Sequence, residues 1–121
     1  MAQKLAIVCT HGPDDPERAT IPFVLATAAQ ASDVEVIMGF QVDGISLVVK
    51  GVAEHVFAAG FAPLKDLIDA YVEAGGEFYL CGPCVNSRKY DPASDFIEGS
   101  KVVNAATFVK VFTEAANVLN Y

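Results

Sequence analysis

The sequence lacks tryptophan, has only two histidines and contains no apolar run near the roughly 20 residues needed to cross a membrane. Its opening, Met1 to Lys4 followed by a short apolar segment, is not typical of a signal peptide. Three cysteines, an odd number, do not indicate the paired disulfide framework of small secreted proteins. We therefore expect a cytoplasmic protein with reduced thiols and no membrane-spanning segment.

Basic residues are also scarce, with eight Lys and Arg against fifteen Asp and Glu and a formal net charge of −7. Surfaces that bind nucleic acid need clustered basic side chains, which displace counterions from the phosphates, so we expect no nucleic-acid partner. Gly12 does not begin a glycine-rich phosphate-binding motif. We accordingly predict no nucleotide and no other bound cofactor.

Apolar residues, in contrast, are abundant at 53% of the chain, and the mean hydropathy is +0.37. The length of 121 residues predicts a single domain over 1–121, large enough to bury its own core. A parallel sheet that is covered on both faces explains part of the apolar excess, because its strands are apolar on both sides. Burial between subunits explains the rest, so we expect a homo-oligomer.

Apolar segments alternate with helix-forming segments along the chain. We expect strands at 4–9, 33–40, 77–80, 101–104 and 118–121, and helices ending near 31 (capped by Thr20, with Pro22 in its first turn), at 63–75 and at 105–117. Residues 43–51 are ambiguous, but Asp43 as an N-cap favours a short helix, and 85–98 holds at most short helical pieces. This alternation predicts an α/β fold in which the loops after the strands line one edge of a parallel sheet.

The motif Cys81-Gly82-Pro83-Cys84 follows directly after the strand expected at 77–80. A CxxC at this position serves dithiol redox chemistry, sulfur transfer or metal binding. If a short helix begins near Pro83, its dipole acts on Cys81, and Arg88 adds positive charge on the same helical face. Both effects lower the pKa of a thiol, and the thiolate is the nucleophile.

Two alternatives can be weighed from the residues around the motif. A thioredoxin-like redox helix would continue for several turns after the second cysteine, whereas Pro92 and the polar residues 86–91 stop it early. Cys9 and His11 would form a four-ligand zinc site with Cys81 and Cys84 if the fold brings the two pairs of residues together. Cys9 is better interpreted as a small buried residue at a strand end, so we predict no metal.

The order and spacing of several segments resemble the DsrE/DsrF-like family, which includes the YchN-type sulfur-relay proteins. The resemblance runs nearly from end to end of the chain. It is carried by the strand at 4–9 with the loop at 12–19, by Asp43-Gly44, by the C-x-x-C-x-x-x-R pattern from Cys81 to Arg88, and by the tail from 96 to 121.

The resemblance implies a three-layer α/β/α sandwich on a parallel sheet of about five strands, which we expect to have flavodoxin-like winding. It also implies trimers or hexamers, with Cys81 as a persulfide carrier, Cys84 as a variable companion and Arg88 at the family's basic position. We therefore predict a sulfurtransferase-like carrier that works with sulfur-donor and sulfur-acceptor proteins. An oligomeric protein that binds a small ligand or metal, and a dithiol–disulfide redox protein, remain alternatives.

Overall fold

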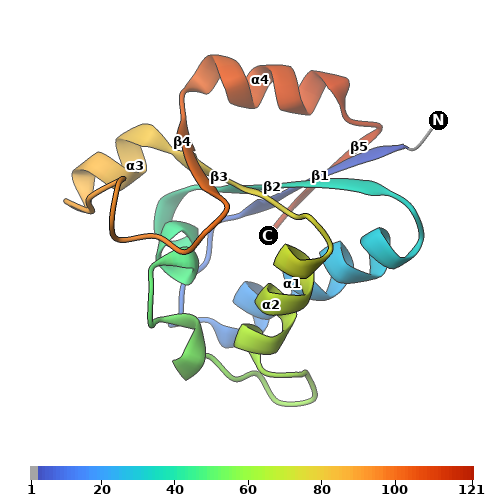
Figure 1. Ribbon diagram of the computed structural model, residues 1–121, viewed down its shortest axis with the longest axis horizontal. Coiled ribbons are helices and arrows are strands. Elements are labelled where there is room, and N and C mark those ends of the chain that lie inside the picture. Colours follow the sequence, from blue (N-terminus) through green and yellow to red (C-terminus); the bar gives the residue numbers. More distant parts are fainter. Residues whose placement is uncertain (1–2) are drawn as a thin grey trace.

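Five short strands form one parallel sheet, and each ends within one residue of the position that the sequence predicts. The computed structural model describes residues 3–121, and the strand order across the sheet is β4-β3-β2-β1-β5 (Figure 1). The strands are β1 Lys4–Cys9, β2 Glu35–Phe40, β3 Phe78–Cys81, β4 Ser100–Val103 and β5 Asn117–Asn120. The helices are α1 Pro16–Ala31, α2 Leu64–Glu73, α3 Gly82–Ser87 and α4 Ala105–Glu114, with 3₁₀ helices η1 Val42–Val48 and η2 Ala53–His55.

The sheet lies between two helical layers, which confirms the three-layer sandwich. Helices α1 and α2 cover one face and α4 covers the other (Figure 1). The strand order departs from the expected flavodoxin winding, 2-1-3-4-5. Here each connection from β1 to β4 moves to the next strand in one direction, and only the last crosses back over the sheet to the far side of β1. Right-handed crossovers that run in opposite directions place their helices on opposite faces, so α4 lies alone on its side.

The core lies between the sheet and the α1–α2 layer. Its centre is a cluster of four fully buried aromatic rings whose neighbouring centroids are 5.2 to 6.4 Å apart: Phe23, Phe40, Tyr71 and Phe78. The one polar atom in this cluster is satisfied, because Tyr71 Oη donates a hydrogen bond of 2.7 Å to the carbonyl of Glu77. Aromatic pairs of this kind each add about 0.5–1.5 kcal/mol beyond area burial, so this layer anchors the sheet.

The first helix begins earlier than predicted. Asp15, not Thr20, is its N-cap, since the Asp15 carboxylate accepts a hydrogen bond of 3.1 Å from the Arg18 N–H. An Asp cap followed by Pro16 at the first helical position is a strong start signal, which explains the difference. Thr20 is buried inside the helix, and Pro22 lies in the helix interior instead of in its first turn.

The ambiguous segment after β2 is helical, as favoured, but it is a 3₁₀ helix with Gln41 and not Asp43 at its N-cap. Gly44 explains its path. A Cβ atom on Gly44 would lie 2.0 Å from the Cys9 carbonyl oxygen, so only glycine lets this turn approach the end of β1. None of the helices described within residues 3–121 is long and apolar enough to cross a membrane.

Candidate functional site

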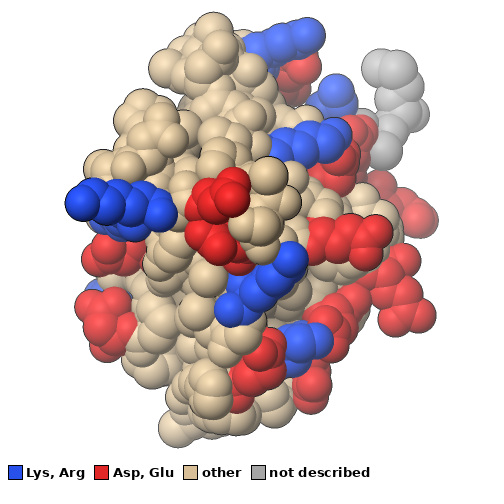
Figure 2. Space-filling view, turned by 60° about the vertical axis from the view of Figure 1, so that its left-hand side comes forward, with Lys and Arg blue, Asp and Glu red and all other residues tan. Residues whose placement is uncertain are grey.

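The carboxyl ends of the strands lie level with one another along one edge. Cys9 of β1 pairs with Phe40 of β2, Phe40 pairs with Leu80 of β3, and Cys81 pairs with Val103 of β4. The loops after β1, β2 and β3 therefore share one edge, as the sequence predicts. Figure 2 shows the molecule with the side that carries α3 turned forward; acidic and basic side chains are mixed there, with uncharged surface between them.

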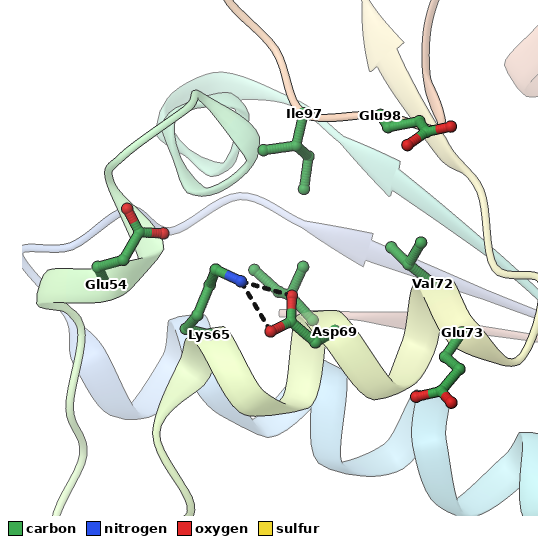
Figure 3. A pocket seen from close by; sticks show the side chains of 8 residues that line it. Glu54, Lys65, Asp69, Val72, Glu73, Ile97 and Glu98 are labelled. Carbon is green, nitrogen blue, oxygen red and sulfur yellow. Dashed lines mark hydrogen bonds and ion pairs between the residues drawn. The ribbon is translucent and has the colours of Figure 1, made fainter.

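The chain leaves β3 and β4 toward opposite faces of the sheet. After β3 and α3, the chain returns on the α2 side, where Ile97 faces α2 across a pocket that Val72 also lines (Figure 3). After β4, Asn104 caps α4 on the other side, since its Oδ1 accepts a hydrogen bond of 3.0 Å from the Thr107 N–H. Ligands of open α/β sheets bind where neighbouring strands diverge in this way. That point is the end of β3, at Cys81.

The Cys81 side chain lies on the α4 side of the sheet. Side chains alternate along a strand, so Phe78 and Leu80 enter the aromatic core while Tyr79 and Cys81 lie on the opposite face. A pocket of about 290 Å³ opens there between the strand ends and α4. It is lined by Gln41, Cys81, Pro83, Val103, Asn104, Ala105, Phe108, Val109 and Phe112. None of these side chains is charged, so the half-buried thiol borders an almost wholly apolar space.

The glycine at position 39 lets Phe108 form the floor of this pocket. A Cβ atom on Gly39 would lie 2.7 Å from Phe108 Cε1, so the ring packs directly on the β2 backbone. Sequence reasoning missed both residues. A glycine inside an apolar strand is the available signal, because it often marks close approach by another group.

The surroundings of Cys81 raise the pKa of its thiol. Desolvation by burial is the largest cause, and contact with the Cys84 side chain adds to it, while the Cys84 N–H and the charge of Arg88 act in the opposite direction. The expectation of a lowered pKa was therefore wrong. The reason is that burial outweighs the favourable charge of Arg88, whose guanidinium is itself directed to a carboxylate.

That carboxylate belongs to Asp43, in the loop after β2. Arg88 Nη2 donates a hydrogen bond of 2.9 Å to Asp43 Oδ1, and Arg88 Nη1 donates one of 3.3 Å to the Cys84 carbonyl. From the same loop, the Val42 N–H donates to Cys84 Sγ at 3.3 Å. The structure thus brings the three candidate residues Cys81, Cys84 and Arg88 together, and it adds Asp43 and Val42 to them.

Cys9 and His11 do not join this group. The Cys9 side chain lies in the core on the α1 side of the sheet, 1% exposed, and burial raises the pKa of its thiol. His11 Nδ1 lies 3.3 Å from Thr10 Oγ1. In the part of the chain that the structure describes, no three His, Cys, Asp or Glu residues are placed to hold a metal ion. The zinc set considered from the sequence is therefore not assembled.

A second, slightly larger pocket of about 330 Å³ lies over α2 (Figure 3). Its apolar lining residues are Ile68 and Val72 of α2 and Ile97 on the facing segment, and its one lysine, Lys65, donates to both Asp69 oxygens at 2.6 and 2.7 Å (Figure 3). It contains no cysteine and none of the residues predicted for the site. Of these two pockets, it is the one beside α4 that is lined by a cysteine, Cys81.

The fold of this chain is similar to those of several solved structures. The YchN protein from E. coli has a TM-score of 0.81 at 17% identity, with 98% of this chain and 99% of that chain covered. MTH1491, a protein of unknown function from Methanobacterium thermoautotrophicum, has a TM-score of 0.71 at 14% identity with both chains covered in full. At these identities the likeness shows the fold alone.

The uncharacterized protein MJ0760 of Methanocaldococcus jannaschii is 26% identical over 111 residues, which is 92% of this chain. The chain spans only 40% of the length of that relative. A family model matches residues 3–121, and hence both cysteines of the CxxC motif, Arg88 and the strands that carry them. That match shows that the chain belongs to the DsrE/DsrF-like family.

Proposed function

We propose that the protein carries sulfur as a persulfide on Cys81. Membership of the DsrE/DsrF-like family suggests a role related to sulfur relay. The observation that carries the finer proposal is the placement of the Cys81 thiol, at a strand end, in the wall of an uncharged pocket and near a second thiol, Cys84. A carrier needs one thiol that is reachable from outside and a space that receives the transferred sulfur.

The loading step is a transfer of sulfane sulfur. The Cys81 thiolate attacks the outer sulfur of a hydropersulfide, R–S–SH; the donor S–S bond breaks, Cys81–S–SH forms, and R–S⁻ leaves. Atoms and charge balance without an external oxidant. Delivery repeats the step with an acceptor thiolate attacking the outer sulfur on Cys81. The apolar wall fits this role, because it excludes water from the sulfur between loading and delivery.

Cys84 supplies a second route. Its thiolate attacks the inner sulfur of Cys81–S–SH, which forms a Cys81–Cys84 disulfide and releases HS⁻. The contact between the two side chains favours this step and also favours dithiol–disulfide redox chemistry as the second candidate function. Either chemistry needs reduced thiols, so the proposal assigns the protein to the cytoplasm.

Donor and acceptor proteins, and further copies of the chain, are the proposed partners. Several large apolar side chains are exposed, among them Val109 on α4 at 60% and Phe57 at 61%. A single helix covers the α4 side of the sheet, which leaves Val118 of β5 exposed as well. These features support burial against other subunits, and the resemblance to the family implies trimers or hexamers; the molar mass from light scattering measures the assembly directly.

Intact-mass spectrometry before and after incubation with a hydropersulfide donor tests the carrier. We expect the protein to gain one sulfur, to lose it on reduction, and to retain the gain in Cys84→Ser but not in Cys81→Ser. Cys9→Ala serves as a matched control, since the buried Cys9 should not accept sulfur. Undiminished loading of Cys81→Ser, or no loading of Cys84→Ser, in which the disulfide route is absent, would overturn the proposal.

A further inference from the structure

We propose that Asp43 and Arg88 form a clamp that positions Cys84 for attack on sulfur bound to Cys81. The inference rests on the proposed function in taking Cys81 as the thiol that reacts first. It goes beyond that function by assigning Asp43, which lies 45 residues from Arg88 in sequence, as a positioning residue. Neither clamp residue touches the reacting sulfur of Cys81 in this assignment.

The clamp holds the end of α3 from two directions. Arg88 donates to Asp43 on one side and to the Cys84 carbonyl on the other, at 2.9 and 3.3 Å. One guanidinium therefore connects the loop after β2 to the backbone of the second cysteine. Because that guanidinium is planar and its donors are fixed in direction, it sets the spacing between the two segments.

The clamp also places a backbone N–H group, that of Val42, within hydrogen-bond distance of the Cys84 sulfur. Val42, next to Asp43, donates its N–H to Cys84 Sγ at 3.3 Å, and the Cys84 side chain lies near enough to the Cys81 thiol to raise its pKa. Cys84 Sγ is thus held between the Val42 N–H and the sulfur that it would attack. A thiol already in place closes a disulfide faster than one that must find its position.

The backbone of the loop is itself constrained. Val42 has a φ of +53°, a conformation that is strained for a β-branched residue and persists only where the surroundings impose it. Ser46 Oγ donates to the Asp43 carbonyl at 2.7 Å, and Gly44 packs against the end of β1. These contacts hold the loop against the end of β1, and the ion pair between Asp43 and Arg88 holds it against α3.

An uncharged diaryl disulfide, Ar–S–S–Ar, separates the two chemical steps. In the first step the Cys81 thiolate forms Cys81–S–S–Ar and releases one Ar–S⁻. In the second step the Cys84 thiolate attacks the Cys81 sulfur, which forms the Cys81–Cys84 disulfide and releases a second Ar–S⁻. Each step releases one Ar–S⁻, so the reaction shows two phases of Ar–S⁻ release. The clamp acts only on the second step, and the rate of the first phase therefore serves as an internal reference.

We expect Asp43→Ala to slow the second phase about two- to fivefold, the range expected for a half-exposed ion pair, and to leave the first phase unchanged. Arg88→Met should slow the second phase more than the first, because the charge of Arg88 also favours the Cys81 thiolate that reacts in the first phase. Asp43→Ala/Arg88→Met should be no slower than the slower single variant, because the residues act as a pair. High salt should slow the second phase of the wild-type protein toward the rate of the variants. Lys65→Gln, which breaks an ion pair of similar exposure on α2, is the matched control and should change neither phase.

An unchanged second phase in Asp43→Ala, equal slowing of both phases, or additive effects in the double variant would overturn the clamp. Reaction of Cys84 before Cys81, shown by a normal first phase in Cys81→Ser, would overturn it as well. The probe is not a persulfide. If the protein does not load sulfur but shows the expected two phases, the proposed function is refuted and the positioning role of Asp43 and Arg88 is supported.

Discussion

Replacing Gly39 by alanine adds one methyl group beneath Phe108, at the floor of the pocket beside Cys81. The added Cβ would lie 2.7 Å from Phe108 Cε1, and ordinary contact begins near 3.4 Å, so the ring must move by about 0.7 Å. Phe108 is only 5% exposed, and the pocket is the open space on its free side. We therefore expect the ring to shift into the pocket and to narrow the access to the Cys81 thiol.

The cost in stability follows from two opposing effects. Overpacking of a buried site destabilises by about 1–3 kcal/mol, while replacing glycine in a strand lowers the entropy cost of folding by roughly 0.5–1 kcal/mol. The expected net loss in the free energy of unfolding is about 1–2 kcal/mol, which denaturant titration resolves. In a Cys84→Ser background, Cys81 should also react more slowly with an uncharged aromatic maleimide.

Phe108→Leu provides the matched background, because the smaller side chain removes the ring atom that the new methyl group meets. In that background Gly39→Ala should be neutral or should stabilise the protein by up to about 1 kcal/mol, since the overpacking is gone and the entropy gain remains. An equal cost of Gly39→Ala in both backgrounds would refute the packing argument. Unchanged Cys81 reactivity, with the stability loss present, would refute the link between Phe108 and access to the thiol.

Two further predictions concern the other end of the same sheet edge. Burial raises the pKa of the Cys9 thiol in the folded protein. Above about pH 8.5 the unfolded chain therefore loses a proton that the folded chain keeps. The free energy of unfolding should then fall by up to about 1.4 kcal/mol per pH unit because of this group. Cys9→Ala should show a shallower fall between pH 8.5 and 9.5, and equal slopes would contradict the assignment. Gly44→Ala should destabilise by about 3 kcal/mol or more, because its Cβ would meet the backbone of Cys9, which has no room to rotate away. If Gly44→Ala unfolds at the same temperature as the wild-type protein, the loop is free to move and the packing argument is wrong.

The strands and the position of the CxxC motif could be predicted from the sequence because both depend on local signals. Short apolar segments bounded by Gly, Pro and Asp mark the strands, and a motif that follows a strand must lie at its carboxyl end. The start of α1 was missed for a local reason as well. Asp15-Pro16 was assigned to a loop, although an acidic cap followed by proline is a signal for the start of a helix.

The faces of the strands could not be predicted in the same way. Both sides of this sheet are apolar, so alternation along β1 and β3 does not reveal that Cys9 and Cys81 lie on opposite faces. The pairing of Asp43 with Arg88 is equally hidden, since it depends on the path of the loop past the end of β1 and on the short length of α3. The first feature separates Cys9 from Cys81, so the zinc set is not assembled. The pKa of Cys81 is raised mainly by burial, which the sequence does not reveal either.

A raised pKa is compatible with a carrier thiol. Each unit by which the pKa rises lowers the thiolate fraction at neutral pH about tenfold, but it raises the nucleophilicity of that thiolate about threefold, so the net rate of attack falls only about three- to fourfold. Oxidation by peroxides, in contrast, follows thiolate character and exposure, and the pocket reduces both for Cys81. In the proposed carrier, a half-buried thiol of this kind would need a donor that enters the uncharged pocket. Selectivity for that donor would then arise from the side chains of α4 around the sulfur and not from a strongly activated cysteine.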